Sequence, residues 1–301
     1  MEITTIGVMS PGDMGQAIAQ RLQEAGFRVQ TALAGRSERT KALARQIGLH
    51  DTGTLDELVA SSDLLISLIN PGNALAFATQ VAGMLRASGG QVVFADLNAI
   101  SPGTARAEDR LIRDAGGRFI DGGILGVPPR GEQRVRVCVS GPDATLFEQV
   151  RHPSLQVRVL SDRVGDASAL KMCNAAMTKG LTALTLELLV AARRLGVEEA
   201  LLAELRGSRS DVLDGQMRTL PGMPSKAYRW VPEVEEIART FEEVGLTRGL
   251  FDGAGELFAM VAGTELGRES PEEARSANRD GLAVVRLLAD ATLPQAGAGN
   301  D

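Results

Sequence analysis

Short stretches of apolar or alternating residues, which are typical of β-strands, recur through the first half of the chain, and helical patterns separate most of them. The strand-like stretches lie at residues 3–9, 27–33, 63–69, 91–97, 118–121, 134–140 and 155–160. Helix starts are marked at Thr54, which has Glu57 three residues later, and at Ser101, which precedes Pro102. Strands that alternate with helices in this way predict an α/β domain with a doubly wound, mostly parallel sheet.

After Gly165 only helical patterns remain. A long pattern rich in Ala and Leu covers residues 167–195 without Pro, and further helical stretches are predicted at 197–206, 224–244, 247–263 and 271–291. We therefore predict two domains, an α/β domain over residues 1–164 and an all-α domain over residues 165–301, with the long helix at their junction. The tail from Pro294 onward is rich in Gly and is predicted to be disordered.

The first strand-like stretch leads through a glycine-containing bend directly into a helical pattern. Gly12 would let the backbone approach a pyrophosphate, and Gly15 would let the helix pack closely on its strand. The N–H groups and the dipole at the start of such a helix favour an anion. An ordinary glycine turn is the alternative, because Ser10 stands at the first glycine position of the dinucleotide fingerprint G-x-G-x-x-G. We predict a Rossmann-type cofactor site that includes Ser10, Gly12, Asp13, Met14 and Gly15.

The residues after the predicted second strand indicate which dinucleotide binds. An acid at the tip of this strand marks NAD, whereas an arginine marks the 2′-phosphate of NADP. Here the strand runs into Ala-Gly-Arg-Ser-Glu-Arg, so Arg36 and Ser37 are predicted to hold that phosphate, and Arg39 and Lys41 at the following helix start support an anion there. NADP (NADPH) is therefore favoured over NAD. Two alternatives stay open: a solvated basic patch, or Glu38 turned inward onto a ribose hydroxyl, which would permit NAD.

Composition excludes several classes of protein. With 301 residues, 44% of them hydrophobic, the chain can form real cores, and its net charge of −6 without a separate basic block argues against a nucleic-acid or membrane partner. Two cysteines, Cys138 and Cys173, form no metal-ligand pattern, so no metal is expected. The chain starts without a basic signal-peptide region, and no apolar stretch looks long enough to cross a bilayer. We expect a soluble, cytoplasmic protein that acts on a small molecule.

Candidates for proton transfer are few. His50 and His152 fall in predicted connections, and Tyr228 lacks a lysine four residues later. In the long helix, Lys171 shares one face with Asn174. A lysine in mostly apolar surroundings can act as a general acid/base because burial lowers the pKa of its amine, and Asn174 could orient the amine or the substrate. The alternative is that Lys171 merely extends into solvent.

With these motifs the chain resembles the β-hydroxyacid dehydrogenase family, relatives of 3-hydroxyisobutyrate and 6-phosphogluconate dehydrogenases, over nearly its whole length. The family's G-F-I-G-L-G-x-M-G, D-x-S-T-x-x-P and K-x-x-N-N motifs appear at residues 7–15, 96–102 and 171–175. The resemblance implies that Lys171 is the general acid/base. It implies that the nicotinamide end of the cofactor lies along Ile69, Asn70, Pro71 and Asn98. It also implies a homodimer formed through the helical domain, in a bacterial subgroup whose C-terminal domain is divergent.

Three departures from the family pattern concern the substrate and the catalytic helix. Ala175 replaces the second Asn of K-x-x-N-N. Leu125 replaces the serine of D-A-P-V-S-G-G that holds the substrate carboxylate in relatives, and leucine cannot donate a hydrogen bond, so a small, tightly held carboxylate is disfavoured. The family's later K-D pair falls at Pro232-Glu233. The predicted substrate-binding residues are Ile124, Leu125, Gly126 and Trp230; Trp230 would suit a bulkier or aromatic substrate, or would be part of the core.

The sequence therefore predicts an NADP-dependent oxidoreductase that interconverts a hydroxy compound and its carbonyl form. A hydroxy acid is the favoured substrate class. The substrate is expected between the two domains. One alternative is an imine reductase on the same scaffold, although such enzymes commonly have Asp or Tyr where Lys171 stands here. Another alternative is an NADP-binding regulator that has lost catalysis.

Overall fold

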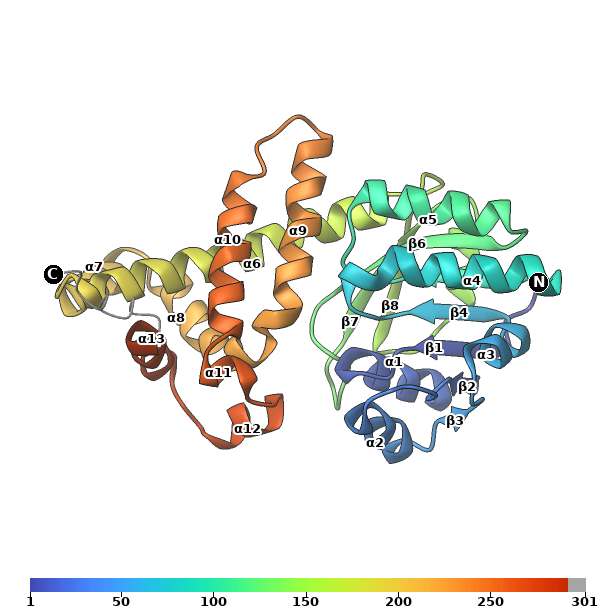
Figure 1. Cartoon of the computed structure of the whole chain (residues 1–301), viewed down its shortest axis with the longest axis horizontal. Coiled ribbons are helices and arrows are strands. Elements are labelled where there is room, and N and C mark those ends of the chain that lie inside the picture. Colours follow the sequence, from blue (N-terminus) through green and yellow to red (C-terminus); the bar gives the residue numbers. More distant parts are fainter. Residues whose placement is uncertain (292–301) are drawn as a thin grey trace, which may run out of the picture. The chain divides into compact units, whose positions relative to one another are not determined.

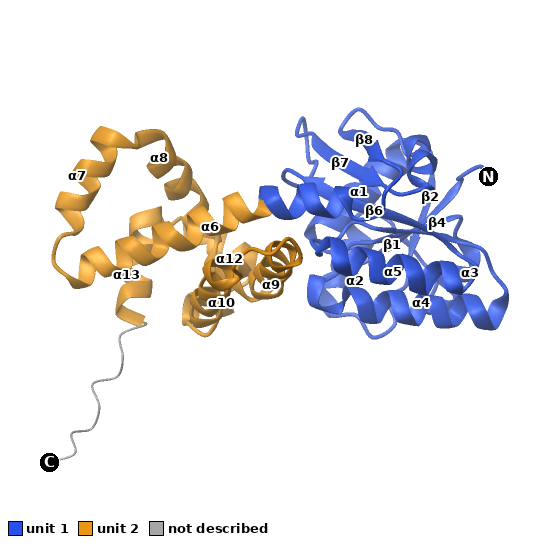
Figure 2. Cartoon of the chain, turned by 90° about the horizontal axis from the view of Figure 1, so that it is seen from above, with its two compact units in different colours: residues 1–174 blue, residues 175–301 orange. Residues whose placement is uncertain are grey.

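The computed structural model describes residues 1–291, in two compact units formed by Met1–Asn174 and by Ala175 onward (Figure 2). Helix α6 (Asp166–Arg194) belongs to both, with its first turns in the first unit. The units thus divide within α6, whereas the predicted domain boundary lies just before that helix. The tail from Pro294, predicted to be disordered, lies outside the described residues.

The first unit is built on one eight-stranded sheet (Figure 1). Its order is β3-β2-β1-β4-β5-β6-β7-β8, and every neighbouring pair is parallel except β6 and β7. The strands are β1 (Thr5–Met9), β2 (Arg28–Thr31), β3 (His50–Asp51), β4 (Leu64–Ser67), β5 (Val93–Asp96), β6 (Arg118–Leu125), β7 (Val135–Ser140) and β8 (Leu155–Ser161). The predicted doubly wound, mostly parallel α/β architecture is confirmed.

Five α-helices connect the strands of this unit, and two of them begin where the sequence predicts. They are α1 (Asp13–Glu24), α2 (Glu38–Gln46), α3 (Leu55–Ser61), α4 (Ala74–Ser88) and α5 (Pro102–Asp114), with short 3₁₀ turns η1 (Pro71–Asn73) and η2 (Ala144–Gln149). Thr54 and Glu57 form a complete capping box at the start of α3. Ser101 accepts from the N–H of Thr104 at the start of α5.

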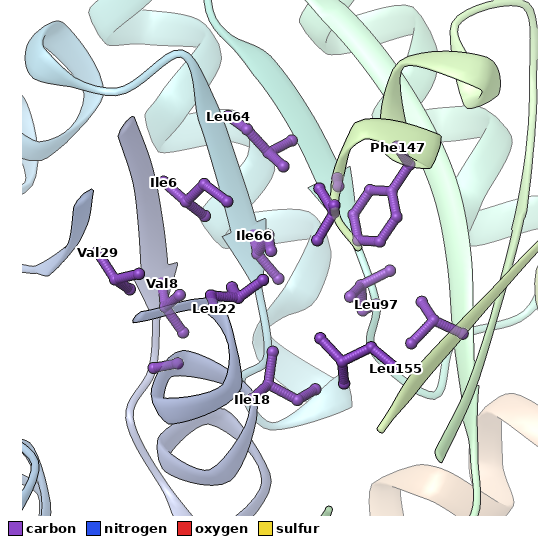
Figure 3. Close-up of a cluster of buried hydrophobic side chains, with 14 of the residues drawn as sticks. Ile6, Val8, Ile18, Leu22, Val29, Leu64, Ile66, Leu97, Phe147 and Leu155 are labelled. Atoms are coloured by element: carbon purple, nitrogen blue, oxygen red, sulfur yellow. The ribbon is translucent and has the colours of Figure 1, made fainter. Parts of the chain in front are cut away.

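Each face of the sheet has its own hydrophobic core. On the face covered by α1 and α2, Ile6 and Val8 of β1 pack in one cluster with Ile18 and Leu22 of α1 and with Phe147 of η2 (Figure 3). On the opposite face α3, α4 and α5 cover Leu65 and a row of rings in which Phe94 lies 6.0 Å from both Phe77 and Phe119. Alternate residues of one strand thus enter different cores, so the continuous apolar runs in the sequence reflect strands buried on both faces.

Within the described residues the second unit contains helices only, as predicted. After α6 come α7 (Glu198–Ser208), α8 (Ser210–Thr219), η3 (Leu220–Gly222), η4 (Pro224–Lys226), α9 (Ala227–Glu243), α10 (Gly249–Ala262), α11 (Glu265–Arg268), α12 (Pro271–Ser276) and α13 (Gly281–Ala291). The predicted single helix over 271–291 is wrong, because the chain turns at Asn278, whose φ is 45°, and restarts at Gly281. Helices α8 and α11 were not predicted, since α8 is polar and contains Gly215 and α11 is a single turn.

Two further details of the first unit differ from the sequence-based expectation. His50 lies in the edge strand β3 and not in a connection, and this strand is too short for its pattern to be recognised. Strand β6 continues past Asp121 through Gly122 and Gly123, which interrupt the apolar pattern. A Cβ on Gly122 would overlap the Leu97 side chain and lie 3.1 Å from the carbonyl oxygen of Asp96, and one on Gly123 would lie 2.7 Å from Lys171 Cβ. Close packing therefore favours glycine at both positions.

The expectation that no segment could cross a bilayer needs correction for α6. By length and composition alone this helix could span a membrane. However, half of its most apolar window is buried inside the protein, and a single helix of this kind is weak evidence for a membrane span. The cytoplasmic location therefore stays a prediction.

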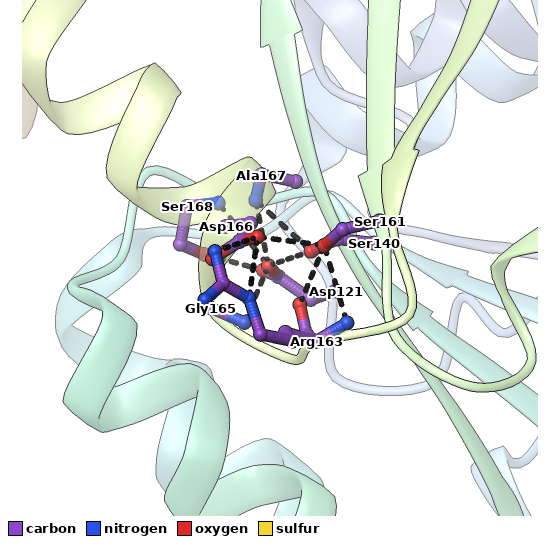
Figure 4. Close-up of polar contacts among 8 residues, drawn as sticks. All are labelled: Asp121, Ser140, Ser161, Arg163, Gly165, Asp166, Ala167 and Ser168. Atoms are coloured by element: carbon purple, nitrogen blue, oxygen red, sulfur yellow. Dashed lines mark hydrogen bonds and ion pairs between the residues drawn. The ribbon is translucent and has the colours of Figure 1, made fainter.

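A buried carboxylate, Asp121 at the middle of β6, ties α6 to the sheet (Figure 4). It accepts hydrogen bonds from Ser140 Oγ at 2.7 Å, from the N–H groups of Gly165 and Ala167 at 2.9 and 3.1 Å, and from both the N–H and the hydroxyl of Ser168. Burial raises the pKa of Asp121, although these hydrogen bonds act in the opposite direction. The start of α6 is thus fixed on β6 and β7 by one side chain.

A second buried carboxyl, Asp96 at the end of β5, organises the neighbouring strand ends. Its oxygens accept from the N–H of Asn98 at 2.8 Å and from Asn98 Nδ2. Burial raises the pKa of Asp96 to about 7; hydrogen bonds from Asn98 and with the Glu108 side chain counteract this, and the charge of Asp121 adds to it. The buried carboxyl of Asp96 therefore binds a proton more tightly than an exposed aspartate does.

We expect Asp121→Ala to lower the free energy of unfolding by roughly 2–4 kcal/mol, because five donors lose their shared acceptor. Urea denaturation measures this change. Asp162→Ala is the matched control, since Asp162 is an exposed carboxylate just before the same helix and should change stability by less than about 0.5 kcal/mol. Equal effects of the two substitutions would contradict the anchoring role of Asp121.

We expect the stability of the wild-type protein to fall more steeply with rising pH than that of Asp96→Asn. The folded pKa of Asp96, about 7, lies above its ordinary value of 3.8, so in this range the folded state binds a proton that the unfolded chain has released. Stability is therefore lost as pH rises toward about 7, by up to about 1.4 kcal/mol per pH unit. Urea denaturation between about pH 5 and about pH 8 measures both slopes. Parallel slopes would show that Asp96 is ionised in the folded protein.

Candidate active site

The turn between β1 and α1 has the geometry that the sequence predicts for a phosphate site. No side chain caps the start of α1 at Gly12, so the first N–H groups of this helix stay available. A Cβ on Gly12 would meet nothing within 4 Å, which leaves open space above the turn. A Cβ on Gly15 would lie 2.1 Å from the carbonyl oxygen of Ser10, so this glycine permits the close approach of helix and turn. Asp13 and Met14 form the first turn of α1. A dinucleotide pyrophosphate fits these features.

The end of β2 presents one half-buried cation. The guanidinium of Arg36 has no hydrogen bond or ion pair within residues 1–291, and burial lowers its pKa. Ser37 caps α2 by accepting from the N–H of Thr40. Glu38 is exposed and pairs with Lys41 at 2.8 Å, so in this structure it does not turn inward. The charge of Lys41 is therefore matched by Glu38, whereas the charge of Arg36 has no such match within residues 1–291.

The ends of β4 and β5 are joined through Asn98. Its Oδ1 accepts from the N–H of Ile69 at 2.7 Å, and its Nδ2 donates to Ser67 Oγ at 2.8 Å and to Asp96. Asn98 is only 3% exposed, so it holds the backbone at Ile69 from inside the protein. Asn70 and Pro71, which follow, are partly exposed and begin η1. The predicted nicotinamide-facing segment is thus held by an inward-facing polar network.

The predicted substrate segment ends β6. Ile124 and Leu125 are 5% and 8% exposed, and Ile124 is part of the core beneath α1. Gly126 has a φ of 134°, a conformation that side-chain-bearing residues rarely adopt. Gly126 has no side chain and can contribute only its backbone groups to the site. Leu125 has an apolar side chain at the position where the family motif has a serine.

Lys171 lies directly against this strand. A Cβ on Gly123 would lie 2.7 Å from Lys171 Cβ and 3.2 Å from the carbonyl oxygen of Ala167, so α6 crosses β6 at this glycine. Lys171 is half-buried and Asn174, one turn further on, is exposed. The fold therefore places the predicted general acid/base beside the predicted substrate segment, both within the first unit. The signal that the sequence analysis missed is Gly123, whose packing role depends on a helix far along the chain.

Trp230 belongs to the second unit and has a defined packing role there. Its ring meets Phe258 edge to face at 5.2 Å, and Lys179 Nζ lies 4.2 Å from its centroid. Lys179 also pairs with Glu233 at 3.2 Å, with both side chains largely buried. This cluster joins α6 to α9 and α10 within that unit. The substrate contact of Trp230 stays a prediction.

Comparisons with known proteins agree with this arrangement. Residues 3–156, half of the chain, match the family model described as the NAD binding domain of 6-phosphogluconate dehydrogenase, and residues 192–261 match a domain of unknown function. A conserved protein of unknown function, described as structurally similar to 3-hydroxyacid dehydrogenases, is 30% identical to this chain. The match covers 91% of this chain and 99% of that one, with a TM-score of 0.62.

Two enzymes of known activity share the fold. The 3-hydroxyisobutyrate dehydrogenase of Mycobacterium tuberculosis, solved with L-serine, is 20% identical with a TM-score of 0.67 over 96% of this chain and 99% of that one. An imine reductase variant from Myxococcus stipitatus, solved with NAD⁺, is 22% identical with a TM-score of 0.52 over the same shares. The cofactor-domain match and the 30% identical relative show that the chain belongs to the β-hydroxyacid dehydrogenase family.

Proposed function

We propose that this protein is an NADP-dependent oxidoreductase that interconverts a hydroxy compound and its carbonyl form, with Lys171 as general acid/base. A hydroxy acid is the favoured substrate class. The observation that carries the proposal is the contact of Lys171 with Gly123, beside the residues predicted to meet the substrate. The bound nicotinamide would accept or supply the hydride. The amine of Lys171 would take the hydroxyl proton in oxidation and return it in reduction, and Asn174 would orient the reacting oxygen.

The cofactor preference rests on the surroundings of Arg36. Its half-buried guanidinium lacks a carboxylate partner within the described chain, and a 2′-phosphate would supply one, with the Ser37 hydroxyl beside it. No acid stands at the tip of β2 to hold a ribose 2′-hydroxyl, and Glu38 pairs with Lys41. The uncapped α1 turn would bind the pyrophosphate. The residues Ile69, Asn70 and Pro71, supported by Asn98, would lie along the nicotinamide.

Imine reduction is the second candidate. Leu125 favours it, because a leucine at the substrate segment cannot hold a carboxylate through a side-chain hydrogen bond. The imine reductase of similar fold shows that the scaffold can support this chemistry in another protein. The presence of Lys171 favours the hydroxy compound, because removal of a hydroxyl proton requires a base. Turnover of hydroxy acids, aldehydes and cyclic imines, measured by NADPH absorbance, separates the two reactions, because activity confined to imines would favour imine reduction. No turnover of any of these compounds would favour the third alternative, an NADP-binding regulator that has lost catalysis.

We also propose that the protein pairs as a homodimer through its helical domain. The second unit exposes large apolar side chains at Leu184, Leu195, Met260 and Leu287. Leu195 and Met260 also line a groove of about 420 Å³ between α6, α10 and α13. Exposed apolar surface of this kind marks protein contacts. Sedimentation equilibrium distinguishes a dimer from a monomer.

We expect Lys171→Ala to lower kcat by a factor on the order of a hundred or more, with the Kd for NADPH nearly unchanged. Lys171→Arg should lose turnover as well, because a guanidinium does not release its proton near neutral pH. Lys226→Ala removes an exposed lysine of the second unit and serves as the control. Wild-type turnover in Lys171→Ala would remove the catalytic assignment.

We expect Arg36→Ala to raise the Kd for NADPH by roughly ten- to a hundredfold and to leave the Kd for NADH unchanged, because only NADPH carries the 2′-phosphate. Isothermal titration calorimetry measures both. Arg45→Ala, an exposed arginine at the other end of α2, is the matched control. Equal affinity of the wild-type protein for both dinucleotides would contradict the role given to Arg36.

A further inference from the structure

The loop between β6 and β7, residues 126–134, is fastened to helix α1, far away in the sequence. Arg21 of α1 donates from Nε to the carbonyl oxygen of Pro129 at 2.8 Å and from Nη2 to that of Gly131 at 3.4 Å. Arg130 of the loop reaches back toward the start of α1, across a separation of 117 residues. This β6–β7 loop therefore brings a charged side chain to the candidate phosphate turn.

Arg130 uses only one edge of its guanidinium for this contact. Its Nη2 lies 2.8 Å from Asp13 Oδ1, 3.1 Å from the Asp13 carbonyl oxygen and 3.1 Å from Gln16 Oε1. Its Nε and Nη1 make no hydrogen bond within residues 1–291, and the side chain is 46% exposed. By contrast, Arg21 is 14% exposed and bonded to backbone carbonyls, as expected for a structural residue. Arg130 thus keeps donors available beside the first turn of α1.

The charges around this turn present a conflict that Arg130 resolves. The N-terminus of α1 favours an anion, and Asp13 already places a carboxylate there. A pyrophosphate at the same turn would be repelled by that carboxylate unless a cation lies between them. Arg130 is the cation that contacts Asp13. An arginine can bind a carboxylate and a phosphate at once because its five N–H donors point in several directions.

We propose that Arg130 is a phosphate-binding residue of the dinucleotide site, supplied by the β6–β7 loop, which bonds the cofactor pyrophosphate directly while it neutralises Asp13. This inference rests on the proposed function, since it concerns the same cofactor. It adds a recognition residue that lies outside the glycine turn and the β2 tip. Because the pyrophosphate is common to NADPH and NADH, Arg130 contributes equally to both, whereas Arg36 discriminates between them.

The test separates a direct phosphate contact from simple neutralisation of Asp13. The Kd values for NADPH and NADH are measured by calorimetry for the wild-type protein, Asp13→Asn, Arg130→Ala and the double variant. In the Asp13→Asn background the carboxylate charge is absent, so any remaining effect of Arg130→Ala reports contact with the ligand. We expect that effect to be about tenfold or more and equal for the two dinucleotides. Arg130→Lys should retain part of the affinity.

Arg134→Ala is the matched control, because Arg134 is an exposed arginine of the same loop. Thermal unfolding of each unliganded variant checks that the loop substitution leaves the fold intact. If Arg130→Ala has no effect in the Asp13→Asn background, or affects NADPH alone, the inference is wrong and the proposed function is untouched. If the wild-type protein binds neither dinucleotide, the proposed function fails together with it.

Discussion

The position of helix α6 on the sheet depends on Asp121. This side chain is completely buried, and its charge is balanced by hydrogen-bond donors and by the start of a helix. A buried carboxylate is stable only when its oxygens are satisfied, so the turn before α6 and the end of β7 have little freedom to move apart. The next turn of the helix carries Lys171. The site of the proposed proton transfer is thus located by an interaction that takes no part in it.

At the neighbouring strand ends, too, buried residues orient the residues that are expected to meet the cofactor. Asp96 orients Asn98, and Asn98 in turn holds the backbone at Ile69. Such a chain of hydrogen bonds transmits the shape of the core to the residues expected to meet the nicotinamide ring. The support residues are polar but inward-facing, and the residues that they support are partly exposed. Preorganisation of this kind lets a site keep its geometry without the ligand.

The sequence predicts features whose causes are local. The capping box at Thr54 and the Ser101-Pro102 start are correct because a helix cap depends on residues three positions apart. The glycine turn is recognisable for the same reason. Strand β3 is not predicted because two residues make no pattern. The break between α12 and α13 is missed because it depends on the left-handed conformation of the single residue Asn278, which is not a glycine.

The site itself requires tertiary information. Nothing near Gly123 in the sequence indicates that Lys171 will lie on it, and nothing near Arg130 indicates that it will reach Asp13. The resemblance to a family supplies part of this knowledge, since it relates Lys171 to a known motif. It does not supply contacts made by residues outside the family motifs, such as those of Arg130 in the β6–β7 loop.

The bare backbone at Gly123 also limits how this scaffold can be redesigned. A side chain at this position would push helix α6 away from the sheet, so most members of a directed-evolution library randomised there would be inactive for reasons unrelated to substrate choice. Leu125 and Val127 stand immediately downstream, and Val127 is exposed. Substitutions at Leu125 and Val127 could change substrate preference while the position of the Lys171 amine on strand β6 is preserved.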